Sequence, residues 1–210
     1  NTICIVPIMG VTWTGMNDDV EALNDALETY NAKTGHNIPI HIDAASGGFI
    51  LPFLFPEKKW DFRLKWVYSI STSGHKYGLV YPGLGWVIWR DKAYLPEYMS
   101  FSVNYLGANI SQVGLNFSRP AAQILGQYYN FIHLGFEGYK DIHTNSMDIA
   151  RYCHKAIGKI HCFENYSEKL ENPLFIWKMK PEYEEKANWT LFDLQDKLMQ
   201  SGWMVPAYTM

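Results

Sequence analysis

The chain has 210 residues, of which 48% are hydrophobic and 19% charged, and its formal net charge is −3. This length suits one large domain or two small ones, with enough apolar residues to bury a substantial core. The weakly acidic balance and the lack of a lysine–arginine run argue against a nucleic-acid partner. No apolar stretch approaches the ~20 residues needed to span a bilayer, so no membrane partner is expected.

Cysteine usage and the first residues indicate where the protein works. The three cysteines, Cys4, Cys153 and Cys162, form no CxxC pair and leave one thiol over, which is typical of a reducing cytoplasm. The opening segment lacks the basic flank of a signal peptide. We therefore expect a cytoplasmic, soluble protein. Because the chain starts at Asn1 inside what resembles a structural unit, we also expect it to be a fragment of a longer protein.

The first half of the chain alternates strand and helix patterns. Short runs rich in β-branched and aromatic residues predict four strands, at residues 2–6, 38–42, 66–71 and 85–90. The last of these is expected to return across the same sheet. Strands that alternate with helical patterns indicate an α/β domain.

A helix is predicted between the first two strands. Apolar residues recur every three or four positions from Val20 to Tyr30, as on one face of a helix. Asn17 or Asp18 would cap its first turn, and Gly35 would end it.

The second half of the chain is predicted to be mainly helical at first. Pro120 suits the first position of a helix that runs to Ile132, and Gly135 and Gly138 interrupt the pattern before a second helical stretch over residues 139–157.

The last segment resembles a second, smaller α+β unit. We expect a strand at residues 173–179 and another at 203–205. Between them, Thr190 and Asp193 have the spacing of a capping box at the start of a helix.

The motif Ser73-Gly74-His75-Lys76 carries the most specific chemistry in the chain. A lysine after one strand and a carboxylate, Asp43, at the end of an earlier strand suit Schiff-base chemistry on a pyridine cofactor. The amine would form an imine with an aldehyde, and the carboxylate would keep the pyridine nitrogen protonated. Most lysines are solvated surface residues, but Gly78 and Gly83 after this one are typical of backbone shaped around a ligand. In open α/β sheets, ligands bind outside the carboxyl ends of the strands, where both residues would lie.

Asp43 has alternative roles. It could cap the following helix or bind a ribose, although Ala44 and Ala45 are small, as required where a flat ring lies against the backbone. His41 would point to the same face and could suggest a metal site, but no third ligand has suitable spacing, so no metal is expected.

Other aromatic and histidine residues are given structural interpretations. Tyr128, Tyr129 and Phe131 are interpreted as core or subunit interface. The remaining histidines are interpreted as ordinary surface or helix residues: His36, His133, His143, His154 and His161.

Several motifs together resemble the glutamate decarboxylase family of fold-type I enzymes, which depend on pyridoxal 5′-phosphate. The motifs are HIDAASGGF (residues 41–49), WDFR (60–63), SGHKYG (73–78), GWVIWR (85–90), NFSRP (116–120) and GWMVPA (202–207). The resemblance covers essentially the whole chain and separates it from aromatic amino-acid decarboxylases.

The resemblance implies a fold and a domain organisation. Residues 1–145 would form the central part of a fold-type I large domain, with a mostly parallel sheet and helices, and would bind the cofactor. Residues 146–210 would begin a smaller α+β C-terminal domain.

The resemblance also implies roles for individual residues. Lys76 would bind the aldehyde of pyridoxal 5′-phosphate, and Asp43 would pair with its pyridine nitrogen. The other implied cofactor contacts are Ala45 against one ring face, Ser73 and His75 on the phosphate, Ser118 on the same phosphate from a neighbouring subunit, and Thr12 near the hydroxyl or carboxylate side.

The implied reaction is decarboxylation of L-glutamate to γ-aminobutyrate and CO2, in a homo-oligomer whose cofactor site lies at the subunit interface. Further pocket residues of the family come from outside this chain, so we expect the chain alone to be inactive. Two alternatives remain: another fold-type I decarboxylase or lyase acting on a different amino acid, and an inactive homologue that serves in assembly. Retention of Lys76 together with Asp43 argues against the inactive homologue.

Overall fold

The computed structural model describes the backbone of residues 2–105, 107–112 and 119–209, and the side chains of these residues except 101, 103–105 and 108–112. The chain divides into two compact units. The first comprises Asn1–Val11 and Met16–Thr144, and the second comprises Thr12–Gly15 and Asn145–Met210. The assignment of a cofactor-binding domain and a C-terminal domain to residues 1–145 and 146–210 stays a prediction.

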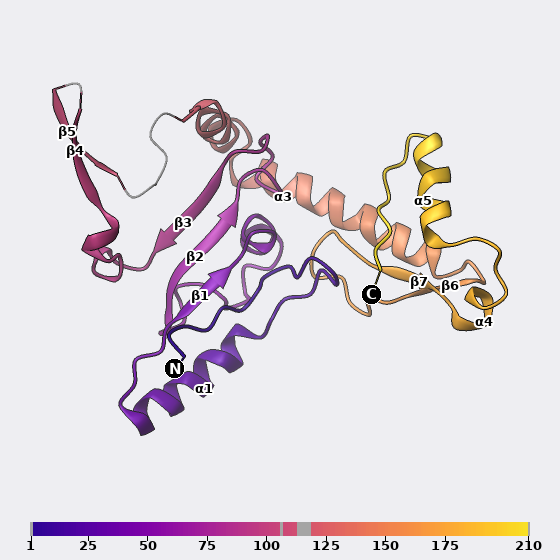
Figure 1. Ribbon diagram of the computed structural model, residues 1–210, viewed down its shortest axis with the longest axis horizontal. Helices are drawn as coiled ribbons and strands as arrows, with labels where there is room; N and C mark the ends of the chain where they lie inside the picture. Colours follow the sequence, from indigo (N-terminus) through magenta and orange to yellow (C-terminus); the bar gives the residue numbers. More distant parts are fainter. Residues whose placement is uncertain (1, 106, 113–118, 210) are drawn as a thin grey trace. The chain divides into compact units, whose positions relative to one another are not determined.

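A three-stranded sheet forms the centre of the first unit (Figure 1). Its strands are β1 (Ile40–Asp43), β2 (Val67–Ser73) and β3 (Gly85–Trp89), in that order. β1 and β2 are parallel, and β3 returns antiparallel to β2. Three of the four strands expected in this half of the chain are therefore confirmed, with ends shifted by one or two residues.

The strand expected at residues 2–6 is wrong. This segment forms only isolated parallel bridges to β1, Ile5 with Ile40 and Ile8 with Asp43. Pro7, between the two bridges, has no N–H to donate, so a regular ladder is interrupted there. Its carbonyl still accepts a hydrogen bond from the Asp43 N–H at 3.0 Å.

The predicted first helix is confirmed as α1 (Val20–Thr34). Its cap is Asp19, one residue later than the expected pair, and the Asp19 side chain accepts a backbone N–H of the first turn at 3.0 Å. Asp18 instead accepts the backbone N–H of Ile8 at 2.7 Å. Gly35 ends the helix as predicted, with the positive φ of 72° that glycine tolerates best.

The core of the first unit lies between α1, the sheet and the chain that leads into β2. Between β1 and β2 this chain forms the short helices η1 (Gly47–Phe49) and α2 (Leu51–Leu54). The buried side chains include Val20, Leu27, Ile40, Ile42, Leu51, Trp60, Leu64, Trp66, Val67 and Ile70. Burying a large apolar side chain contributes about 1.5–3 kcal/mol to the free energy of folding, so this core stabilises the positions of β1 and β2.

The chain after β3 contains elements that the sequence did not predict. They are two short helices, η2 (Lys92–Tyr94) and η3 (Glu97–Met99), and a hairpin of β4 (Phe101–Tyr105) with β5 (Ala108–Gln112).

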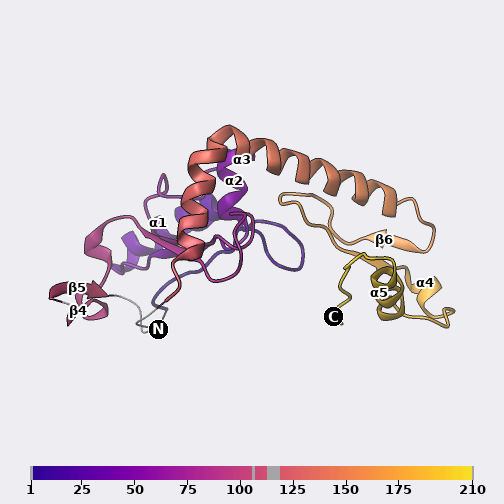
Figure 2. The same cartoon turned by 90° about the horizontal axis from the view of Figure 1, so that it is seen from above.

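The long helix α3 (Ala122–Ile157) is bent (Figure 2). It starts two residues after Pro120, so the prediction that Pro120 is its first residue is wrong. The predicted interruption is confirmed at Gly135, where φ is 59° and ψ is −166°. This conformation is essentially restricted to glycine, so the bend is built into the sequence. α3 contributes residues to both units.

The second unit contains a two-stranded sheet of β6 (Phe163–Asn165) and β7 (Trp177–Met179). The strand expected at residues 173–179 is confirmed only over β7, and β6 was not predicted. Residues 203–205, the other expected strand, form no ladder with any described residue, so that prediction is wrong.

Two helices follow β7, α4 (Pro181–Glu184) and α5 (Leu191–Gln200). The predicted capping box of α5 is confirmed: the Thr190 hydroxyl accepts the Asp193 N–H at 3.3 Å, and the Asp193 carboxylate accepts the Thr190 N–H at 2.7 Å.

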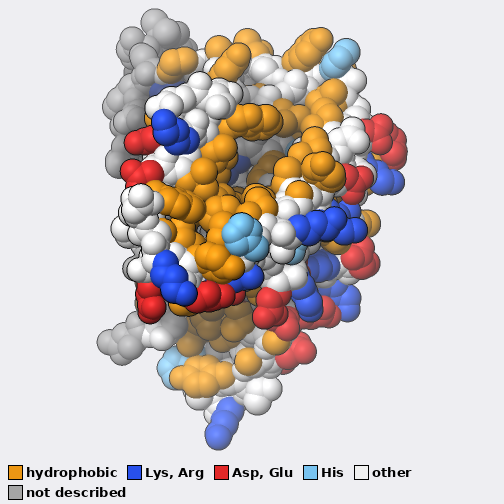
Figure 3. All heavy atoms as spheres, turned by 90° about the vertical axis from the view of Figure 1, so that its right-hand side faces the viewer, with side chains coloured by type: hydrophobic (Ala, Val, Ile, Leu, Met, Phe, Trp, Pro, Cys, Tyr) orange, Lys and Arg blue, Asp and Glu red, His pale blue; other side chains and the backbone are white. Residues whose placement is uncertain are grey.

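Hydrophobic side chains are common at the surface. Many of them are visible, in orange, on the face shown in Figure 3, among charged side chains of both signs. Tyr128, Tyr129 and Phe131 of α3 are 64%, 61% and 42% exposed, so they are not core residues. Across the described part of the chain, no helix combines the length and hydropathy of a membrane span.

Candidate functional site

The carboxyl ends of β1 and β2 meet at one edge of the sheet. Asp43, the last residue of β1, pairs with Ser71 of β2. The pairing continues beyond the strand: the Ala44 N–H donates to the Ser71 carbonyl at 2.9 Å, and the Ser73 N–H donates to the Ala45 carbonyl at 3.3 Å. The motifs that contain Asp43 and Lys76 therefore leave the sheet side by side.

Asp43 is half-buried and fixed on both sides. Its backbone N–H donates to Pro7 and its carbonyl accepts from Met9, at 3.0 and 2.8 Å. The side-chain Oδ1 accepts the Ala45 N–H at 3.0 Å. No described residue donates a hydrogen bond to Oδ2, so this oxygen can accept one from a ligand. The carboxylate caps no described helix, which removes that alternative for Asp43.

Lys76 lies on the turn that follows β2, and its side chain is exposed. Its Nζ is 3.4 Å from the Oγ of Ser46, three residues after Asp43. The amine thus lies beside the motif that carries the carboxylate. Sequence reasoning missed Ser46, although it stands inside the HIDAASGGF motif.

The structure brings five of the seven predicted site residues to this edge. The residues at the edge are Asp43, Ala45, Ser73, His75 and Lys76. The His75 Nδ1 is 3.0 Å from the Leu84 carbonyl, which fixes the ring. Thr12 is exposed and belongs to the other compact unit. Ser118 lies outside the described residues, so its role stays a prediction.

His41 connects β1 to β2. Its Nδ1 is 2.7 Å from the Ser69 hydroxyl and its Nε2 is 3.2 Å from the Ser71 hydroxyl. Burial lowers the pKa of His41, and the negative charge of Asp43 partly opposes that shift. The geometry fits a neutral imidazole that donates at one nitrogen and accepts at the other.

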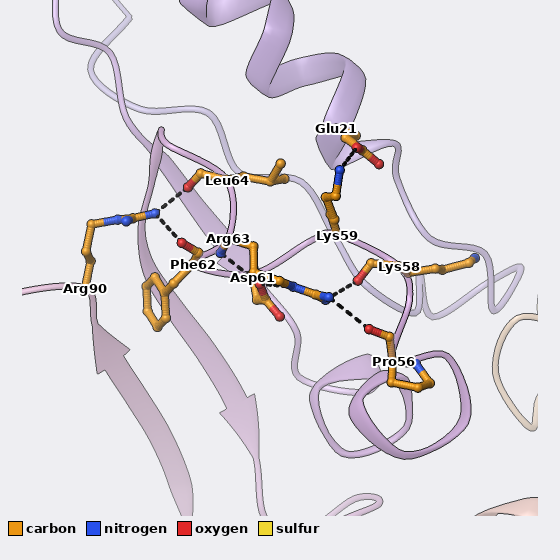
Figure 4. Close-up of polar contacts among 9 residues, drawn as sticks. All are labelled: Glu21, Pro56, Lys58, Lys59, Asp61, Phe62, Arg63, Leu64 and Arg90. Atoms are coloured by element: carbon orange, nitrogen blue, oxygen red, sulfur yellow. Dashed lines mark hydrogen bonds and ion pairs between the residues drawn. The ribbon is translucent and has the colours of Figure 1, made fainter.

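The side chains of two arginines, Arg63 and Arg90, donate hydrogen bonds to backbone carbonyl groups of the chain before β2 (Figure 4). The acceptors are Pro56 and Lys58 for Arg63, and Phe62 and Leu64 for Arg90. Arg63 also donates to the Asp61 carboxylate at 2.9 Å. The WDFR motif therefore acts as a support for β2 and contributes no side chain to the sheet edge.

Sequence reasoning also missed polar residues of α3 that pack on the Lys76 turn. Gln127 and Tyr139 are 0% and 1% exposed. His143 is a helix residue, as interpreted, but it does not lie at the surface: it is 1% exposed and lies among the rings of Phe53, Tyr77 and Tyr139. Burial lowers the pKa of His143, and the backbone of Tyr77 partly opposes the shift. The only sequence signal was the 3.6-residue pattern, which cannot say what packs against a helix face.

A protein-family model described as the pyridoxal-dependent decarboxylase conserved domain matches residues 1–180 of the chain. The chain belongs to this family. Decarboxylases of several organisms match it over nearly its whole length. "Glutamate decarboxylase beta" of Listeria monocytogenes is 52% identical over 207 residues, which are 99% of this chain and 44% of that protein. "Glutamate decarboxylase 5" of Arabidopsis thaliana is 51% identical over 210 residues, 100% of this chain and 42% of that protein.

Solved structures share the fold of this chain. A glutamate decarboxylase of Lactobacillus brevis superimposes with a TM-score of 0.91 at 50% identity, over 98% of this chain and 46% of that one. A sphingosine-1-phosphate lyase of Burkholderia pseudomallei reaches a TM-score of 0.74 at 24% identity, over 97% of this chain and 44% of that one. The expected α/β, fold-type I architecture is thereby confirmed. The chain spans less than half the length of these relatives.

Proposed function

We propose that the protein carrying this chain decarboxylates L-glutamate to γ-aminobutyrate and CO2 with pyridoxal 5′-phosphate. One observation carries the proposal: Asp43 ends β1, Lys76 lies on the turn after the paired strand β2, and the Lys76 amine lies beside Ser46. The 52% identity to a glutamate decarboxylase of Listeria monocytogenes supports the choice of substrate.

The chemistry of the residues at the sheet edge fits this cofactor. A half-buried carboxylate with one oxygen available suits a protonated pyridine nitrogen, and an exposed amine suits an aldehyde. Ala45 is small enough for a flat ring to lie against it, and Ser73 and His75 provide hydroxyl and imidazole groups for a phosphate. When bound, pyridoxal phosphate supplies a sink for the electrons left when the bond to the substrate carboxylate breaks.

The residues of the chain have separate tasks in this proposal. The charge of Asp43 keeps the proton on the pyridine nitrogen, and the Ala45 N–H holds the carboxylate in place for that task. The Lys76 Nζ would supply the amine that holds the aldehyde group of the cofactor. The Ser46 hydroxyl, 3.4 Å from Nζ, orients the Lys76 amine at the sheet edge.

Assembly and location belong to the same proposal. We infer a cytoplasmic homo-oligomer in which a neighbouring subunit supplies Ser118 to the phosphate. The exposed aromatic residues of α3 support an interface, because large apolar patches are uncommon on surfaces that stay in water. The three cysteines are free thiols, which supports a reducing compartment.

The test uses the complete protein. After incubation with pyridoxal phosphate and reduction with borohydride, peptide mapping should find the label on Lys76. Lys76→Ala should lose both the label and glutamate decarboxylation, down to background. Lys33→Ala, at an exposed position in the last turn of α1, is the matched control and should retain both.

Two results would contradict the proposal. A label on another lysine, or none in the wild-type protein, would show that the site is misassigned. Decarboxylation of aromatic amino acids with none of glutamate would favour the alternative of a different amino-acid decarboxylase.

A further inference from the structure

We propose that Gln127 and Tyr139 are positioning residues for Lys76: they hold the carbonyl of Gly78 and thereby fix the turn that carries the lysine. The inference rests on the proposed function, in which the Lys76 amine binds the cofactor aldehyde and therefore has to be held in position. Both residues lie on α3, and neither contacts the amine itself.

The two side chains and the carbonyl form a closed network. The Gln127 Nε2 donates to the Gly78 carbonyl and to the Tyr139 hydroxyl, each at 2.8 Å. The Tyr139 hydroxyl donates in turn to the same Gly78 carbonyl at 3.0 Å. Because both side chains are buried, these hydrogen bonds do not compete with water and act at low dielectric. Gly78 is two residues after Lys76, so the network acts close to the amine.

The backbone hydrogen bonds within the turn are long: the Lys76 nitrogen lies 3.4 Å from the Ser73 carbonyl oxygen, and the Leu79 nitrogen lies 3.3 Å from the Lys76 carbonyl oxygen. Leu79 has a φ of 65°, which is costly for a residue with a branched side chain. Its carbonyl accepts a hydrogen bond from Asn130 of α3 at 2.9 Å. A strained conformation of this kind persists only when neighbouring structure enforces it, and α3 does so.

The Gln127 amide also fits closely against the turn. A Cβ added to Gly78 would lie 2.5 Å from the Gly74 carbonyl oxygen and 2.8 Å from the Gln127 Oε1. A Cβ added to Gly74 would lie 2.5 Å from the same Oε1. Glycine at both positions therefore lets the buried amide approach the backbone. The opposite amide orientation would place Oε1 against the Gly78 carbonyl, so the hydrogen bonds of Nε2 determine how the side chain lies.

The bend of α3 makes the network possible. Gln127 and Tyr139 are 12 positions apart, which in a straight helix would separate them by about 18 Å along the axis. Glutamine and tyrosine side chains cannot span that distance, yet their polar atoms are 2.8 Å apart. Gly135 lies between them with the one non-helical conformation of α3, so both halves of the helix reach the same carbonyl.

The first measurement asks whether the network holds the turn. Tyr139→Phe removes one hydroxyl and keeps the ring, and Tyr152→Phe, at a 74% exposed position of the same helix, is the matched control. Hydrogen exchange is followed in the complete protein without cofactor. Amides of residues 76–80 should exchange about fivefold to tenfold faster in Tyr139→Phe, the effect of losing one ordinary hydrogen bond, and should be unchanged in Tyr152→Phe. Equal exchange in both variants would overturn the proposal.

The second measurement asks whether the turn positions the amine. Tyr139→Phe should form the borohydride-reducible adduct with pyridoxal phosphate about fivefold more slowly than wild type. It should bind pyridoxine 5′-phosphate, which has an alcohol in place of the aldehyde, with unchanged affinity. Equal losses in both assays would mean that the whole pocket is damaged and would overturn the positioning role. Gln127→Met, which keeps the side-chain volume and removes both donors, should show a larger effect in the same direction.

The two proposals fail in different ways. A wild-type protein that forms no adduct at Lys76 would refute the proposed function and, with it, the positioning of an amine. Normal adduct formation by wild type, together with an unchanged rate in both Tyr139→Phe and Gln127→Met, would refute the positioning role alone.

Discussion

The two halves of the candidate site are held in different ways. Asp43 ends a strand with neighbours on both sides, so backbone hydrogen bonds to Pro7, Met9 and β2 fix its position. Lys76 lies on a turn with long internal hydrogen bonds. Side chains of α3, which is distant in sequence, hold that turn by donating hydrogen bonds to the Gly78 carbonyl. The position of the Asp43 carboxylate is therefore determined mainly by its strand, whereas the position of Lys76 depends on the packing of α3 against the turn. A substitution at Asp43 should change chemistry without changing the fold, and substitutions around the Lys76 turn should change both.

The largest expected effect is at the carboxylate. Asp43→Asn keeps an oxygen for the Ala45 N–H but removes the charge that would hold the pyridine proton. We expect the rate of glutamate decarboxylation to fall by about 10²–10³-fold, as when one preorganised electrostatic contact is lost. The thermal midpoint should stay close to that of wild type, because the backbone of β1 is untouched. Steady-state kinetics at saturating cofactor, with exposed Asp196→Asn as control, measures this. An unfolded Asp43→Asn protein would show that the strand alone does not hold this position.

The next largest expected effect is on stability, and it compares a crowded glycine, Gly78, with a glycine of positive φ in open space, Gly35. Gly78→Ala would place its Cβ 2.5 Å from the Gly74 carbonyl oxygen, and backbone cannot yield as a flexible side chain can. We expect a loss of about 2–3 kcal/mol in the free energy of unfolding. Gly35→Ala, at a φ of 72° with nothing within 4 Å of the added Cβ, should cost only about 1 kcal/mol. Urea unfolding of the two variants gives the comparison. Equal losses would mean that the Lys76 turn is less tightly packed than its distances indicate.

The smallest effect is a pH dependence from His143, on the helix that supports the turn. Burial lowers its pKa, so the native protein takes up this proton only at a lower pH than the unfolded chain does. The stabilising contribution is therefore complete above the ordinary histidine value of about 6.5 and is lost as pH falls through the lower native pKa. His143→Phe cannot titrate, and its thermal midpoint should fall less steeply with acidification. His41, whose pKa is also lowered, acts in the same direction, so part of the slope should remain. Identical slopes in the two proteins would exclude His143 as a source.

Local patterns predicted the half of the site that the backbone determines. The β-branched runs located β1 and β2, and strand direction then placed Asp43 at the carboxyl edge of the sheet. The spacing of apolar residues located α1, and Thr190 with Asp193 located the start of α5. In each case the deciding interaction lies within a few residues, so the sequence contains it. The cap of α1 was misplaced by one residue because Asp18 and Asp19 are chemically equivalent and Asp18 bonds to Ile8 instead.

The missed features depend on residues that are distant in sequence. Nothing near Gln127 indicates that its amide meets Gly78, 49 residues earlier. The residues next to His143 in sequence are like those around many exposed helix residues, and only tertiary packing buries its side chain. Residues 203–205 have a β-rich composition but pair with no described strand. Composition measures how well a segment suits a strand, while a strand forms only where a partner is available.

The bend of α3 also determines when the Lys76 turn can be completed. The two partners of Gly78 follow it by 49 and 61 residues, so the network closes two long loops. Contacts between such distant residues form late, because the entropy of loop closure must be lost first. A growing chain must therefore extend past Tyr139 before the turn is held. The proposed binding of an aldehyde by Lys76 should therefore appear late in folding, and newly made protein should acquire that ability only after α3 has docked.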